Sequence, residues 1–88
     1  MKIKKGFILR SLGDNYFVVP IGAATIDFKS LISLNDTSAF LWKQLENDVT
    51  LEELVNSFIN EYEVDYSVAK ADINAFIEKL KQTNVLEY

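Results

Sequence analysis

The side chains that could do chemistry in this 88-residue chain are carboxylates and hydroxyls, because the sequence contains neither histidine nor cysteine. Those two residue types supply the usual general bases, thiolate nucleophiles and metal ligands of enzymes. The serine hydroxyls therefore have no imidazole to activate them. The three glycines occur singly and form no G-x-G-x-x-G or P-loop phosphate-binding pattern. We therefore expect neither enzyme activity nor a bound cofactor.

The acidic run Glu61, Glu63 and Asp65 is the sharpest candidate for a site that holds a hard cation. It lacks the twelve-residue loop, the central glycine and the bidentate glutamate of an EF-hand. The adjacent Glu52 and Glu53 point in different directions on a helix, so they cannot flank one scissile bond. We interpret residues 61–65 as a solvated junction between helices, and predict no catalytic or metal-ligating residue.

The net charge of −4 is unevenly distributed along the chain. The first ten residues carry only cations, whereas every charged residue from 46 to 65 is an acid. A duplex-binding protein needs a concentrated cationic face, so this distribution argues against nucleic acid as a partner. No apolar run approaches the roughly 18 residues that span a bilayer, and the basic start is not followed by a signal-peptide core. We expect a cytoplasmic protein without a membrane partner.

Four strand-like segments rich in β-branched and aromatic residues occupy the first part of the chain, at 7–11, 16–19, 25–28 and 31–34. Gly13-Asp14-Asn15 tolerates positive φ and predicts a hairpin turn between the first two. Lys29-Ser30 is the predicted turn between the last two, and Pro20 marks a strand end. The sheet should have exposed edges, and we expect no strand after the helices to cover one.

Three amphipathic helices are predicted to follow. Asn35 caps the first, which runs to about Glu46; Thr50 and Glu53 form the capping box of the second; Asp65 caps the third. Their predicted buried residues are Ala39 or Phe40 with Leu41, Trp42 and Leu45, then Leu51, Leu54, Val55, Phe58, Ile59 and Tyr62, and finally Ala69, Ile73, Phe76, Ile77 and Leu80. Val85-Leu86 should pack back onto the core. Strands followed by helices predict one α+β domain spanning residues 1–88.

Trp42 has two interpretations. A lone tryptophan on a small domain can anchor a partner, but the position of Trp42 matches the buried stripe of its helix. We favour core packing.

Four stretches resemble the PqqD-like family, in order and with matching spacing. Residues 34–42 resemble L-N-E-T-G-A-x-[IL]-W, with Ser38 where the family often has glycine. Residues 50–55 are similar to T-x-E-E-L-V, residues 61–65 to E-Y-x-V-D, and residues 71–80 to D-[VI]-x-x-F-[LI]-x-x-L. Each stretch alone is a generic capped helix, so the specificity comes from the four together.

The resemblance implies a winged-helix-like fold, with N-terminal antiparallel hairpins of three to four short strands and three helices, known as a RiPP recognition element. Such a chaperone captures the leader segment of a ribosomally synthesised precursor peptide and presents it to a modifying enzyme. In pyrroloquinoline quinone biosynthesis that enzyme is a radical S-adenosylmethionine protein. The leader adds as a strand to the third strand and rests on the third helix. The peptide-binding residues implied in this chain are Leu31, Ile32, Ser33, Leu34, Val68, Asp72, Ala75 and Lys79.

Three alternatives remain open from the residues. Ile32 and Leu34 are as consistent with core packing as with peptide contact, because alternation places half of a strand inside. Winged-helix regulators share the architecture, but the third helix is nearly neutral for DNA binding, with Lys70, Lys79 and Lys81 against Asp72 and Glu78. An exposed strand edge could also pair with a second copy and form a homodimer.

Overall fold

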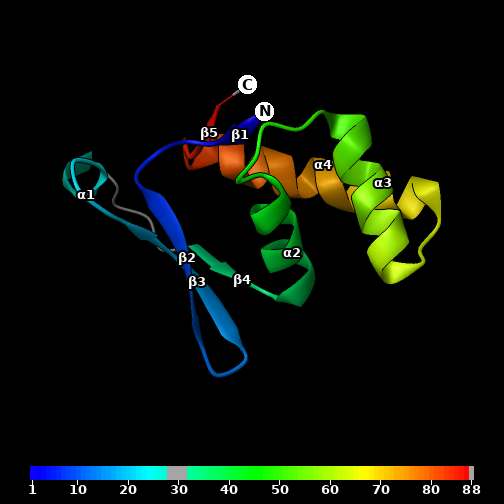
Figure 1. Ribbon diagram of the computed structural model, residues 1–88, viewed down its shortest axis with the longest axis horizontal. Helices are drawn as coiled ribbons and strands as arrows, with labels where there is room; N and C mark the ends of the chain where they lie inside the picture. The colour runs from blue at the N-terminus through cyan, green and yellow to red at the C-terminus, as the bar shows by residue number, and fades with distance from the viewer. Residues whose placement is uncertain (28–31, 88) are drawn as a thin grey trace.

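The computed structural model describes residues 1–27 and 32–87 (Figure 1). In chain order the elements are β1 (Lys2–Ile3), β2 (Phe7–Leu12), β3 (Asn15–Pro20), α1 (Ala24–Asp27), β4 (Ile32–Leu34), α2 (Asp36–Gln44), α3 (Leu51–Tyr62), α4 (Tyr66–Gln82) and β5 (Leu86–Glu87). Four short strands therefore precede the three long helices among the described residues. This arrangement confirms the predicted α+β class.

The main sheet is antiparallel and has the strand order β2-β3-β4. The hairpin register runs from Phe7↔Pro20 to Leu12↔Asn15. Gly13-Asp14 is therefore a two-residue turn, and Gly13 supplies the positive φ of 63° that such a turn requires. The first predicted hairpin is confirmed, and Pro20 is the last residue of its strand, where no further ladder donor is needed.

The predicted strand at 25–28 is wrong over its described part, because residues 24–27 form the short helix α1. Local hydrogen bonds explain the difference: the Thr25 N–H and hydroxyl both donate to the Gly22 carbonyl, at 3.2 and 2.8 Å. These bonds offer the backbone an alternative to a strand ladder. Phe28, the turn at Lys29-Ser30 and Leu31 lie outside the described residues.

A second small sheet joins the two ends of the chain. β1 pairs with β5 in antiparallel register, Ile3↔Leu86, and Figure 1 shows the two labelled strands side by side. The expectation that no strand follows the helices is therefore wrong. Asn84, with φ 61°, turns the chain out of α4, and the buried Val85 and Leu86 then draw the tail onto the core as expected.

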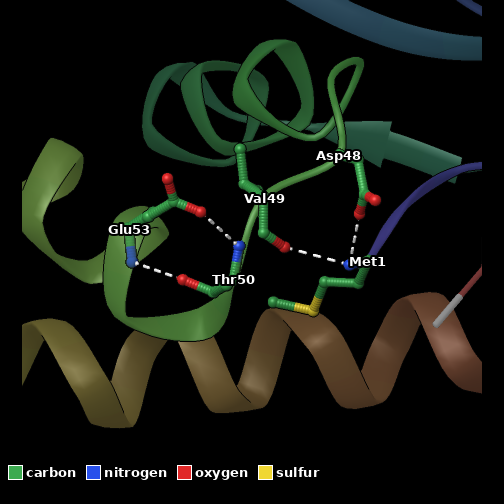
Figure 2. Close-up of polar contacts among 5 residues, drawn as sticks. All are labelled: Met1, Asp48, Val49, Thr50 and Glu53. Atoms are coloured by element: carbon green, nitrogen blue, oxygen red, sulfur yellow. Dashed lines mark hydrogen bonds and ion pairs between the residues drawn. The ribbon is translucent and has the colours of Figure 1, made fainter.

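The helix starts follow the predicted caps. Asn35 Oδ1 accepts a hydrogen bond from the Ser38 N–H at 2.9 Å. Thr50 and Glu53 form the reciprocal capping box drawn in Figure 2, with bonds of 3.1 and 2.9 Å. Asp65 stands at the N-cap position of α4 in extended conformation, but its side chain makes no capping hydrogen bond.

The core lies where α2, α3 and α4 meet the inner face of the main sheet. Its largest fully buried side chains are Trp42, Ile32, Leu45, Leu54, Ile73, Leu80, Val55 and Val85. The predicted stripes of α2 and α4 are buried, with Ala39 inside and Phe40 half-buried. In α3 the stripe is only partly buried, because Leu51, Ile59 and Tyr62 stay half-exposed at its margin. Trp42 is 0% exposed, so its core interpretation is confirmed.

The N-terminal residue is bound to the loop between α2 and α3. The Met1 ammonium donates to Asp48 Oδ1 at 2.8 Å and to the Val49 carbonyl at 3.0 Å, as Figure 2 shows. The Val49 N–H in turn donates to the Met1 carbonyl at 3.0 Å. The hydrogen bond from the ammonium, and then its charge, lower the pKa of the Asp48 carboxyl below its ordinary value of 3.8. This pair therefore links the first strand to the helical half.

The Asp48 contact predicts an acid-sensitive contribution to stability. A carboxyl whose pKa is lower in the folded state stabilises the fold above its ordinary pKa, and that stabilisation disappears as pH falls through the folded pKa. We therefore expect Asp48→Asn to lower the melting temperature slightly at neutral pH, and expect the difference from the wild type to begin to shrink near pH 4 and to keep shrinking as the pH falls further. Asp14→Asn, which removes the same charge at the hairpin tip, is the control. A difference that stays constant on acidification would contradict the ion pair's role.

Candidate functional site

β4 forms one end of the main sheet. It pairs with β3 through Tyr16↔Leu34, Phe17↔Ser33 and Val18↔Ile32, and within residues 1–27 and 32–87 no strand pairs with its other side. β5 does not cover it, because β5 pairs with β1. An edge strand of this kind presents backbone N–H and C=O groups that another chain can pair with.

The side chains of β4 alternate between the core and the surface. Ile32 is 1% exposed and Leu34 is 6% exposed, whereas Ser33 between them is exposed. Of the two interpretations left open for Ile32 and Leu34, core packing is therefore confirmed for their side chains. What β4 presents outward is the Ser33 side chain and the backbone.

Lys79 of α4 reaches β4 directly. Its Nζ donates a hydrogen bond to the Ser33 carbonyl oxygen at 3.4 Å. The register gives the direction of this carbonyl: the two-residue turn makes Leu12↔Asn15 a hydrogen-bonded pair, so by alternation Phe17 pairs its N–H and C=O with β2. Ser33 lies opposite Phe17, so its carbonyl faces away from β3, in agreement with the contact from Lys79. The N–H and C=O of one residue in an antiparallel strand face the same neighbour. Ser33 therefore directs both groups to the unpaired side of β4, which we call the open edge.

The exposed side of α4 carries the other residues implied in the site. Val68, Asp72, Ala75 and Lys79 are all exposed, and their spacing of three and four residues places them on one side of the helix. The eleven helical steps from Val68 to Lys79 rise about 16 Å, close to the length of a five-residue strand. Of these four residues, Lys79 is the one that a hydrogen bond joins to β4 within the described part of the chain.

Sequence reasoning did not foresee the bond between Lys79 and Ser33. The two residues lie 46 positions apart, and neither the helix period nor the strand period relates them. The spacing on α4 placed Lys79 on one side of the helix with Val68, Asp72 and Ala75, but only the tertiary structure shows that it reaches β4.

The sequence profile of the family described as Coenzyme PQQ synthesis protein D (PqqD) matches residues 22–86, well over half of the chain. The chain belongs to the PqqD family. The family resemblance drawn from the four motif stretches is thus confirmed. No curated protein matches the chain.

A solved structure of TbiB1 in complex with the TbiA(beta) leader peptide has the same fold as this PqqD-family chain. The TM-score is 0.77, and the alignment covers 99% of this chain and 95% of that one. At 23% sequence identity, the likeness establishes the fold.

Other surfaces of this PqqD-family chain lie apart from the open edge. A depression of about 290 Å³ is lined by Met1, Leu51, Asn74, Ile77, Glu78 and Lys81, on a different side of α4 from Val68 and Lys79. Among the described residues, no three acidic side chains gather as a metal site would require, Glu61, Glu63 and Asp65 included. No helix in the described part of the chain is long and apolar enough to cross a bilayer.

Proposed function

We propose that this PqqD-family chain is a non-catalytic peptide chaperone, which binds the leader segment of a ribosomally synthesised precursor peptide as an added strand on the open edge. It holds the peptide for a separate modifying enzyme, such as a radical S-adenosylmethionine protein. The observation that carries the proposal is the outward-facing backbone of Ser33 at the end of the main sheet. Strand addition at such an edge draws affinity from main-chain hydrogen bonds.

The exposed side of α4 supports the same function. A guest strand on the open edge would lie beside this helix, which offers the apolar surface of Val68, 48% exposed, and the charges of Asp72 and Lys79. Main-chain bonds are the same for every sequence, so side-chain contacts with a helix of this kind are what could fix the register of a leader.

The comparisons support a peptide as the ligand. TbiB1, which shares the fold over 95% of its length, is in complex with a leader peptide. The absence of histidine and cysteine from the sequence agrees with a role in which the chemistry belongs to another protein.

The test is a titration of the isotope-labelled chain with synthetic peptides that correspond to the N-terminal halves of any short reading frames encoded beside its gene. We expect binding at about micromolar affinity, with chemical-shift changes at Ile32–Leu34 and on the exposed side of α4. A scrambled peptide of the same composition is the control. Shifts confined to β1, β5 and α3, or equal binding of the scrambled peptide, would contradict the proposal.

A further inference from the structure

The hydrogen bond between Lys79 and Ser33 uses a group that a guest strand would need. Strand addition requires a guest N–H to donate to the Ser33 carbonyl, and that oxygen already accepts from Lys79 Nζ. The bond is long, at 3.4 Å, and exposed, so it is weak and easily exchanged. The lysine side chain and the guest backbone would therefore use the same acceptor.

Lysine on a strand edge is one of the devices by which proteins prevent unwanted pairing of open strands. Lys79 reaches an open strand edge of this kind from a neighbouring helix. Because the bond from Lys79 to the Ser33 carbonyl is weak, a guest strand could displace the lysine side chain at little cost in free energy.

We propose that Lys79 covers the open edge in the peptide-free protein and is displaced by the arriving strand, so that the leaders selected carry an aspartate or glutamate side chain facing Lys79. This inference rests on the proposed function and adds to it the chemistry of the peptide.

The charges on α4 explain why the displaced ammonium selects a carboxylate. Asp72 stands seven residues earlier, about 10 Å along the helix, too far to neutralise Lys79. Glu78 pairs instead with Lys81 at 3.8 Å. A guest strand lying beside α4 brings its own side chains within reach of Lys79, and a carboxylate there replaces the long bond to a carbonyl with a shorter, charge-assisted one.

The experiment is a selection from a display library of random-sequence peptides on the whole chain, in parallel for the wild type, Lys79→Glu, Lys79→Gln and Lys81→Glu. Lys81→Glu makes the same charge change on another side of α4 and is the matched control. We expect peptides selected on the wild type and on Lys81→Glu to share an acidic residue at one fixed position of a strand-like motif. On Lys79→Glu that position should become basic, and on Lys79→Gln the preference should disappear.

Affinities then measure the effect. The best acidic peptide should bind Lys79→Glu about tenfold more weakly than the wild type, and its lysine-substituted counterpart should restore the loss. If the selected peptides shift the β4 resonances but show the same charge preference on all four proteins, the inference about Lys79 is overturned while the proposed function stands. If no selected peptide shifts the β4 resonances, both are overturned.

Discussion

Replacing Ser33 with proline should abolish peptide binding while leaving the domain folded. Proline lacks the backbone N–H, and is tolerated in edge strands where that N–H faces away from the ladder. The bond from Lys79 indicates that Ser33 faces the open edge, so the substitution should leave the pairing of β4 with β3 intact. The guest strand would lose a hydrogen bond and meet the proline ring at the centre of β4.

Two measurements check this result. Calorimetric titration with the leader peptide should show no binding to Ser33→Pro, and its melting temperature should stay close to that of the wild type. Ser33→Ala keeps the N–H and removes only the exposed hydroxyl, so it should bind like the wild type. Binding by Ser33→Pro, or a marked loss of its stability, would show that the Ser33 backbone does not serve the open edge.

The second large effect is expected from Trp42→Ala, which should destabilise the fold by about 3–5 kcal/mol. Trp42 is fully buried in α2, directly after β4, and a truncation there leaves a cavity that the packed helices can fill only in part. For a domain of 88 residues the whole free energy of unfolding is about 4–13 kcal/mol. The variant should therefore be partly unfolded or close to it, as measured by denaturant titration.

Trp42→Phe separates packing from hydrogen bonding. The Trp42 Nε1 is buried and has no hydrogen-bond partner among the described residues, so phenylalanine loses volume but no polar contact. We expect a cost of about 1–2 kcal/mol, well below that of alanine. Equal destabilisation by both variants would show that the indole N–H contributes to the fold.

The elements that sequence reasoning predicted well are those whose signals are local. Two of these signals lie within a few residues: the capping box at Thr50 and Glu53, and the turn at Gly13. The third, the apolar stripe of α4, repeats within a single helix, so all three could be identified without knowledge of the fold. The predicted strand at 25–28 failed because β propensity depends on a neighbouring strand, and Thr25 bonds to Gly22 instead. β1 and β5 were not predicted because strands of two residues have no detectable period.

The candidate site was predictable only in outline. The family resemblance indicated β4 and one side of α4, and the alternation of β4 showed that Ser33 must face away from Ile32 and Leu34. Whether Ile32 and Leu34 face the core, or Ser33 does, depends on the register of β4 with β3, which is a tertiary property. The contact of Lys79 with Ser33 depends in turn on how α4 lies beside the sheet.

The pairing of β1 with β5 bears on how this domain can be combined with others. Because Ile3 lies opposite Leu86, the first and last strands, β1 and β5, lie together at one place in the domain, as Figure 1 shows. A domain with adjacent ends can be grafted into a surface loop of a host protein through two short linkers. The linkers to the host would leave from the β1–β5 sheet, so the open edge of β4 in the main sheet would stay accessible in such a chimera.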